Sequence, residues 1–342
     1  MPSEIQLTEA TYLDTSKRRK LNIRGIELDE GFLSELVIDY LKRNHGQSRP
    51  TITTAFDIYM SQSLSAHRRK FRADAHHYFG LFIKHFGDLP LDELKHAHIT
   101  EYRDIQLARG LHPSSVRKHN NMLNAMLTMA FKHLNIDRLS PFRGLQIRGE
   151  MENIRPIPAI DRMLLLQVKE AMIRHHSTAS LIGLIQLNTG MRISEPSLAR
   201  LDDLVLDHDI PHLWVRKNKL TDRKTRASIR AVPLVGVSLE AAKILHQSAK
   251  RNNSQWLAPQ YANEIGNTTC SATLNKSLRR WKFRSHMFRH AFIDRLKACN
   301  DIPLPLAEAI TGHGRHVSDF ANYGTVGYTL KQKLEVIWKV EI

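Results

Sequence analysis

Apolar residues recur at a spacing near 3.6 through residues 50–135, and this periodicity restricts that stretch of the chain to helices. Gly87–Pro90 interrupts the pattern, Thr100 can cap the next helix, and Gly110 can end it. Pro113 can then open a further helix. The stretch lacks the alternation of a strand, so we predict a helical bundle.

A second pattern begins after residues 149–158, where the periodicity lapses and Pro156 and Pro158 favour an extended backbone. Three short stretches rich in Val, Ile and Leu follow among helical ones: LVLD, HLWVRK and SIRAVPLV. The sequence predicts a mainly α fold with a small antiparallel β-sheet. We divide it into an N-terminal segment that is a candidate accessory arm (1–49), a helical domain (50–148) and an α+β domain with a C-terminal helical tail (155–342).

The N-terminal segment carries a basic run at Lys17–Lys20 and an amphipathic helical pattern over residues 28–43. The basic run is either a solvated tail or an arm that contacts nucleic acid.

The chain has a strong excess of positive charge. Fifty Lys and Arg residues face 34 Asp and Glu residues, which gives a net charge of +16. Such an excess favours a polyanionic partner, most often nucleic acid, over a basic surface kept for solubility.

Cysteine and apolar patterning bound the environment. Cys270 and Cys299 are the two cysteines, which excludes a disulfide framework and a Cys-rich zinc site and fits a reducing compartment. The sequence shows no signal peptide and no apolar run long enough to span a membrane. We therefore expect a cytoplasmic protein, associated with the nucleoid through DNA, with no membrane partner.

Two regions concentrate basic side chains. The predicted helical bundle carries Arg68, Arg69, Lys70, Arg117 and Lys118. The hairpin candidate over residues 212–234 carries Arg216, Lys217, Lys219, Arg223, Lys224, Arg226 and Arg230. A β-ribbon this basic fits a DNA groove. The alternatives are an ordinary bundle with solvated lysines and a solvated turn.

The densest set of reactive groups lies in residues 286–323. His286, Arg289 and His290 fall at i, i+3 and i+4, so they share one face of a helix. Alone, this pattern also suits an ordinary helix with its polar residues outward. Zinc is a further alternative, but Met287 stands where the metalloprotease motif has its Glu.

A turn and a phenol follow that helix. Gly312 can adopt the left-handed conformation that ends a helix, which would fix His313 in a turn. Ser318 can cap a last short helix that presents Tyr323. Tyr323 by itself could equally be a partly buried aromatic residue whose hydroxyl is satisfied.

Arg192 projects from a tight turn upstream, in the stretch NTGMR. It can pair with Glu195 or Asp202, or it can clamp an oxyanion in the bidentate geometry that suits a guanidinium.

Taken in order, these motifs resemble the tyrosine recombinase, or phage integrase, family. The resemblance rests on TGMRISE, RKTRASIRAVPL, HMFRH, TGHG and ANYG, and covers about residues 50–330, most strongly 185–325. It implies a helical core-binding domain and an α+β catalytic domain that close around duplex DNA as a C-shaped clamp. One departure is the segment between His313 and Tyr323, which carries an additional basic pair, Arg315 and His316.

The resemblance also implies roles for the matching residues. Tyr323 is the expected nucleophile, which forms a 3′-phosphotyrosyl link and frees a 5′-hydroxyl. Arg192 and Arg289 are expected to hold the non-bridging oxygens of the scissile phosphate. His286 and His313 are expected to hydrogen-bond the same phosphate and to assist proton transfer.

The general acid is the remaining role. Lys224 is expected to protonate the leaving 5′-oxygen, because a Lys-Thr step precedes the Val-Pro-Leu end of a strand in this family. Lys217 and Lys219 are its rivals on the same hairpin. His290 is expected to have a packing or supporting role.

Elementary chemistry agrees with these roles. Attack on a phosphodiester places negative charge on its oxygens, and fixed guanidinium groups stabilise that charge. A phenol has a pKa near ~10, so it needs nearby cations or a base in order to ionise. Cationic side chains can take the place of metal ions, so we expect no cofactor and predict cleavage in the presence of EDTA.

The resemblance implies double-stranded DNA as partner, a homo-tetramer on two DNA sites, a Holliday-junction intermediate and accessory DNA-bending proteins. Integration or excision of a mobile element is the expected biological role. The alternatives are a type IB topoisomerase-like enzyme, a zinc hydrolase and a non-catalytic DNA-binding protein of the same fold. The C-terminal helix, with Leu330, Leu334, Ile337 and Trp338 apolar, either docks on a neighbouring protomer or packs on its own domain.

Overall fold

The computed structural model describes residues 49–150, 160–221, 228–313 and 327–342, together with the backbone of three short strands near the N-terminus. The chain divides into two compact units, Met1–Arg155 and Pro156–Ile342. The first unit holds the strands and four of the described helices, and the second holds the remaining helices and a second sheet.

The N-terminal strands form an antiparallel sheet in the order β1 (Tyr12–Leu13), β2 (Lys20–Ile23) and β3 (Ile26–Asp29). The helix predicted over residues 28–43 is wrong at its start, because Leu28 and Asp29 pair with β2. The rest of that prediction lies outside the described residues, as do Lys17, Arg18 and Arg19 of the basic run.

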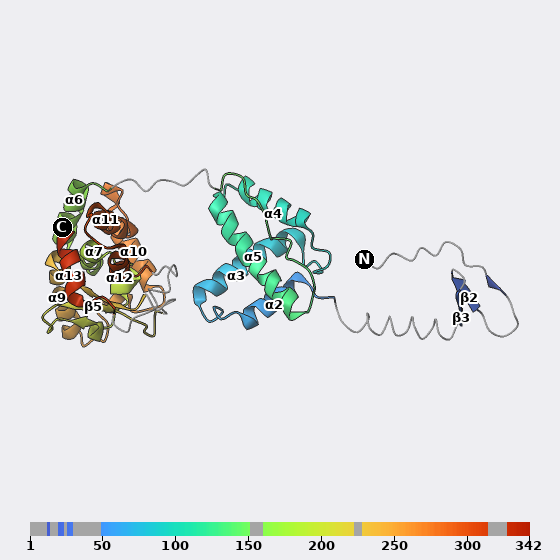
Figure 1. Cartoon of the computed structure of the whole chain (residues 1–342), viewed down its shortest axis with the longest axis horizontal. Helices are drawn as coiled ribbons and strands as arrows, with labels where there is room; N and C mark the ends of the chain where they lie inside the picture. Colours follow the sequence, from blue (N-terminus) through green and yellow to red (C-terminus); the bar gives the residue numbers. More distant parts are fainter. Residues whose placement is uncertain are drawn as a thin grey trace. The chain divides into compact units, whose positions relative to one another are not determined.

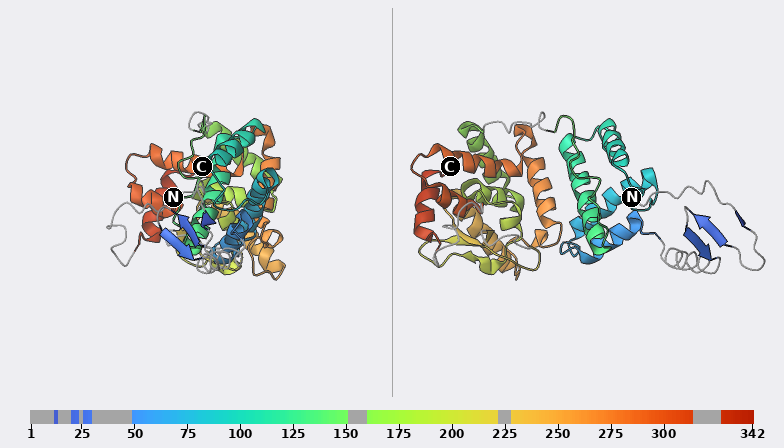
Figure 2. Two further views of the ribbon diagram at one scale, coloured as in Figure 1. Left: turned by 90° about the vertical axis from the view of Figure 1, so that its right-hand side faces the viewer. Right: turned by 45° about the vertical axis from the view of Figure 1, so that its right-hand side comes forward.

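Helices α2 (Ile52–Gln62), α3 (Arg69–Phe86), α4 (His96–Ala108) and α5 (Pro113–His133) form the predicted bundle. Figure 2 shows them gathered in one body, coloured blue to green. Its core includes Phe82 and Tyr102, whose ring centroids lie 5.1 Å apart. Thr100 does not cap α4, because the helix begins at His96 and the Thr100 hydroxyl donates to the Ala97 carbonyl at 2.8 Å.

The second unit is built around α7 (Thr178–Thr189), in which every residue from Ala179 to Thr189 is buried. Its neighbours are α6 (Arg162–His175), α9 (Gly236–Arg251), α10 (Gly266–Ser277) and α11 (Ser285–Ala298). Figure 1 shows α7 inside this unit. An apolar helix with no polar face can be stable only when other elements cover it all round.

A small antiparallel sheet lies beside these helices, in the order β4 (Leu204–Val205), β5 (His212–Val215) and β6 (Arg230–Pro233). These strands match the three predicted from the sequence. Val215, the last residue of β5, pairs with Arg230, the first residue of β6. The mainly α fold with a small antiparallel sheet is therefore confirmed. Short elements complete the unit: α8 (Ser194–Ser197), η1 (Leu201–Asp203), η3 (Pro259–Tyr261) and η4 (Arg279–Trp281).

Two helices close the second unit. Helix α12 (Leu304–Thr311) ends at Gly312 in the predicted left-handed conformation, with φ +70°. Helix α13 (Leu330–Lys339) contacts α12 and β6, and its Val336 and Ile337 are buried. Helix α13 thus packs on its own domain, one of the two alternatives, while Trp338 stays 56% exposed.

Candidate active site

Among the predicted site residues that the structure describes, Arg289 and His313 are in contact through the Arg289 guanidinium. This side chain projects from α11 and is only 3% exposed. Its Nη1 donates to the Gly190 carbonyl at 2.8 Å, and its Nη2 donates to the Thr311 carbonyl at 2.7 Å. Arg289 therefore joins the turn that precedes Arg192 to the turn that carries His313.

The loss of hydration inside the unit, followed by the nearby charge of Arg192, lowers the pKa of Arg289 to about 10. The group still remains a cation at neutral pH. Burying a cation is unfavourable unless it is hydrogen-bonded, and the two carbonyl oxygens supply those bonds. A guanidinium held in this way is preorganised to meet an anion.

His313 lies against Arg289, with Nε2 at 3.0 Å from Arg289 Nη2. Its Nδ1 lies 2.9 Å from the Thr311 hydroxyl, which itself donates to the Ala307 carbonyl at 2.9 Å. Arg289 Nη2 also lies 3.4 Å from Nδ1. Because the Thr311 hydroxyl donates to the Ala307 carbonyl, it can accept from a proton on Nδ1. In this tautomer Nε2 is the atom that can take up a proton.

Arg192 lies in the turn between α7 and α8. Gly190 ends α7 with φ +62°, and a Cβ at this position would lie 2.4 Å from the Phe292 ring. The chain can therefore turn sharply here. Ser194 is the first residue of α8, and Ile193 holds the cap position.

The Arg192 backbone N–H donates to Glu195 Oε2 at 2.9 Å, and its Nη1 lies 3.4 Å from Glu195 Oε1. The Arg192 side chain is 43% exposed, whereas that of Glu195 is 1% exposed. Pairing with Glu195, the first alternative for Arg192, is thus present, but the guanidinium still reaches solvent.

Arg230 is the largest departure from the sequence analysis, which placed it on a DNA-facing hairpin. It is 4% exposed and forms a fork with Glu195, through Nη2–Oε2 at 2.9 Å and Nη1–Oε1 at 3.2 Å. Arg230 is therefore an internal residue, although it belongs to the hairpin interpreted as a basic ribbon or a solvated turn. Its position in an apolar strand, SIRAVPLV, was the signal for burial.

His286 lies on the same face of α11 as His290, with ring centroids 4.7 Å apart at an angle of 88°. Burial, and then the positive charges of His290, Arg289 and Arg192, lower the pKa of His286. His286 is therefore neutral at pH 7 and can donate one hydrogen bond. Among the described residues, no group of three or more potential metal-ligating side chains comes together.

Structures of known proteins share this architecture. The transposon Tn1549 integrase in complex with transposon right end DNA aligns with a TM-score of 0.59 and 16% identity, over 85% of this chain and 99% of that one. A lambda integrase tetramer bound to a Holliday junction aligns with a TM-score of 0.59 and 12% identity, over 90% of this chain and 96% of that one. At these identities, the likeness shows the fold. A search of curated proteins found no match.

Residues 163–326 match the model of the phage integrase family, and this stretch includes Arg192, Arg289 and His313. Residues 163–326 therefore form a domain of the phage integrase family, the tyrosine recombinases.

Two predicted catalytic residues of the recombinase, Lys224 and Tyr323, lie outside the described residues, as do Arg223 and Arg226. Lys217 and Lys219 lie just after β5, before that segment, and both are exposed. The general acid and the nucleophile stay predictions.

The basic residues predicted on the helical bundle have different surroundings. Arg69, Lys70 and Lys118 are exposed, and Lys70 forms an ion pair with Asp74 at 3.2 Å. Arg117 is already engaged inside the recombinase: its Nη2 donates to Glu150 Oε2 at 2.6 Å and to the Leu145 carbonyl at 2.7 Å. Arg68, at the N-terminal cap of α3, is partly buried.

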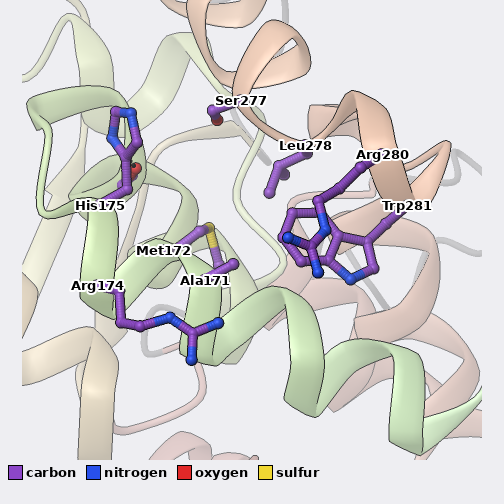
Figure 3. Close-up of a pocket in the computed structure, with 9 residues that line it drawn as sticks. Ala171, Met172, Arg174, His175, Ser277, Leu278, Arg280 and Trp281 are labelled. Atoms are coloured by element: carbon purple, nitrogen blue, oxygen red, sulfur yellow. Dashed lines mark hydrogen bonds between the residues drawn. The ribbon is translucent and has the colours of Figure 1, made fainter.

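A cavity of about 330 Å³ opens elsewhere on the recombinase, between α6 and the end of α10 (Figure 3). Arg174, His175 and Arg280 border it, and Arg280 lies over the Trp281 ring at 4.2 Å. None of the predicted catalytic residues lines this cavity, so the site described above is not built around it. Within the described residues, no helix is long and apolar enough to cross a membrane.

Proposed function

We propose that this recombinase cuts and rejoins DNA at specific sites through a covalent 3′-phosphotyrosyl link to Tyr323. The carrying observation is the convergence on Arg289, which is buried, held by two carbonyl oxygens and in contact with His313. The Gly190 and Thr311 carbonyls and His313 use three of its five N–H groups, which leaves Nε–H and one N–H of Nη1.

The cleavage step follows from these groups. The Tyr323 oxygen attacks the scissile phosphorus, and the bond from phosphorus to the 5′-oxygen breaks. Arg192 and Arg289 stabilise the charge on the non-bridging oxygens. Lys224 gives a proton to the leaving 5′-oxygen. Religation is the reverse reaction, so the bond energy is kept and no ATP is needed.

His286 and His313 can each serve the proton and hydrogen-bond steps of this scheme. His286 is neutral because burial and neighbouring cations lower its pKa, so it can donate one hydrogen bond to the phosphate. His313 Nε2 has a lone pair that now accepts from Arg289, and the same lone pair can receive the phenol proton.

The wider function rests on the family. The helical unit and the catalytic unit would close on duplex DNA as a clamp, and four copies would exchange strands between two sites through a Holliday junction. The similar structures are consistent with this, since one is a transposon integrase with transposon end DNA and another is a tetramer on a Holliday junction. Integration or excision of a mobile element is the role we propose.

A nicked suicide substrate tests the proposal. The protein would be incubated in EDTA with nicked duplexes made from the DNA that flanks its gene, and denaturing gels would detect a protein–DNA adduct. We expect an adduct with the unsubstituted protein and none with Tyr323→Phe, which should still bind the duplex. An adduct that persists in Tyr323→Phe would refute the nucleophile assignment. Binding without any adduct would favour the non-catalytic alternative, and relaxation of supercoiled DNA lacking any of these sequences would favour a topoisomerase.

A further inference from the structure

Arg230 occupies a place that the catalytic scheme does not use. It lies at the start of β6, with its guanidinium buried between three segments of the second unit. Its fork to Glu195 reaches α8, and its Nε donates to the Ile310 carbonyl at 2.7 Å, at the end of α12. One planar group thus links a strand, the Arg192 turn and the helix that leads to His313.

The linkage to the His313 turn is tight. Gly312 has φ +70°, and a Cβ added there would lie 2.6 Å from Arg230 Nη1 and 2.9 Å from its Cζ. The glycine backbone therefore rests directly on the guanidinium plane. Any shift of Arg230 must move the turn in which His313 contacts Arg289.

The linkage to Arg192 passes through Glu195. This carboxylate accepts from the Arg192 backbone, lies near the Arg192 guanidinium and holds both ends of the Arg230 fork. Burial acts to raise the pKa of Glu195, but the charge and hydrogen bonds of Arg230, and then those of Arg192, hold it below the ordinary value. Arg289, on α11, also interacts electrostatically with it.

Competition for Glu195 follows from this arrangement. A buried carboxylate needs a cationic partner. Arg230, which is buried and makes both fork bonds, satisfies that need and leaves the Arg192 guanidinium only a long contact at 3.4 Å. Without Arg230, the nearest cation to Glu195 would be Arg192, whose guanidinium is needed at the phosphate.

We propose that Arg230 is a positioning residue of the recombinase: by occupying Glu195 and supporting the Gly312 turn, it keeps Arg192 free for the scissile phosphate and His313 in register with Arg289. This inference rests on the proposed cleavage reaction. Arg230 itself touches no DNA and no reacting atom.

The test compares Arg230→Gln with the double variant Glu195→Gln/Arg230→Gln, in single-turnover cleavage of the nicked duplex that gives the strongest adduct. In Arg230→Gln, Glu195 should capture Arg192, and cleavage at pH 8 should fall roughly 10- to 100-fold, as for other small displacements of reacting groups. Losing Arg230 removes the largest influence that lowers the pKa of Glu195, so the deficit should shrink as pH falls and Glu195 takes up a proton.

The double variant has no carboxylate to capture Arg192, so it should recover most of the lost rate and show the pH profile of the unsubstituted protein. Arg295→Gln is the matched control, because Arg295 also ties backbone carbonyls together in this unit, those of Leu187 and Val340, but holds no carboxylate. It should lower thermal stability and leave the shape of the pH profile unchanged. Cleavage by Arg230→Gln at the unsubstituted rate, or losses that merely add in the double variant, would overturn the proposal.

A second readout needs no DNA. The Nε–Hε NMR signal of Arg192 in the full-length protein should move on Arg230→Gln substitution, titrate with Glu195, and return in the double variant. An unmoved signal would refute the positioning role. If the unsubstituted protein forms no adduct but the Arg192 signal moves as expected, the proposed cleavage reaction fails while the structural linkage stands.

Discussion

Arg289 Nη2 and His313 Nε2 lie 3.0 Å apart, so a buried arginine donates to a histidine across the centre of the site. This contact couples the position of the arginine that we propose to hold the phosphate to that of the histidine that we propose to accept a proton. Backbone carbonyls at Gly190 and Thr311 hold the arginine in place, so its orientation belongs to the fold of the unit.

Arg289→Lys should therefore be far from conservative. A single ammonium cannot reach both carbonyls and His313 in the fixed geometry of a guanidinium. We expect single-turnover cleavage to fall by about 100- to 1000-fold, the range seen when a preorganised donor to a developing oxyanion is removed. Filter binding of the same duplex should change only a few-fold, since most affinity comes from other phosphate contacts. Cleavage that stays near the unsubstituted rate would show that Arg289 has no role at the phosphate.

Gly312→Ala should destabilise the second unit. An alanine forced into the left-handed region costs roughly 1–2 kcal/mol. The added Cβ must also displace the Arg230 guanidinium, because it would lie 2.6 Å from Nη1. Gly110→Ala is the control, since Gly110 has φ +80° with nothing within 4 Å of an added Cβ. Urea denaturation should give the larger free-energy loss for Gly312→Ala, and equal losses would show that Arg230 yields at no cost.

The helical bundle should lose stability in mild acid through His119. Burial first, and then the charges of His77 and Arg109, lower the pKa of His119 to about 4. The unfolded chain has the ordinary value and so binds more protons between about pH 6.5 and pH 4. Stability from this group is thus complete above about pH 6.5 and is lost as pH falls, by up to about 3 kcal/mol.

His119→Phe should reduce the loss of stability below about pH 6.5, here called the acid limb, because a phenyl ring cannot titrate. The ring keeps the stacking on Tyr78, whose centroid lies 3.9 Å from that of His119. Urea denaturation at pH 7 and pH 4.5 measures the difference. Replacement of the exposed His67 by Gln should leave the acid limb as it is. An acid limb that is identical in His119→Phe and the unsubstituted protein would refute the assignment.

Arg117 and Lys118 are neighbours on α5 that should behave differently. Lys118→Ala should weaken DNA binding and reduce the slope of log affinity against log salt by about 1, without changing stability. Arg117→Ala should also destabilise the bundle by about 1–2 kcal/mol, since Glu150 and the Leu145 carbonyl lose a charged partner that is partly screened by solvent. Salt-dependent binding and urea denaturation of both variants would separate the effect on DNA affinity from the effect on stability. Unchanged stability of Arg117→Ala would contradict the structural role of Arg117.

Local signals predicted the elements well where they were strong. The 3.6 periodicity predicted the helices of the bundle, and the Val- and Ile-rich stretches predicted β4, β5 and β6. Gly312 was predicted to end a helix in the left-handed conformation, and its φ is positive. The predicted helix over residues 28–43 was wrong at its start, because Leu28 and Asp29 gain strand partners from β2 that an amphipathic pattern cannot reveal.

The candidate site also combines features that are local in the sequence with features that depend on tertiary contacts. The spacing of His286 and Arg289 on one helix face and the turn at His313 are local, so the sequence alone determined which residues could act and, with the order of the motifs, the family. Only the tertiary structure decided that Arg117 pairs with Glu150 and Arg230 with Glu195. In the sequence, both arginines belong to basic stretches that could contact DNA. The physical reason is that the residue type does not reveal the surroundings of a basic side chain, which can be solvent or a buried carboxylate. Its role depends on whether folding brings a carboxylate such as Glu195 or Glu150 within reach.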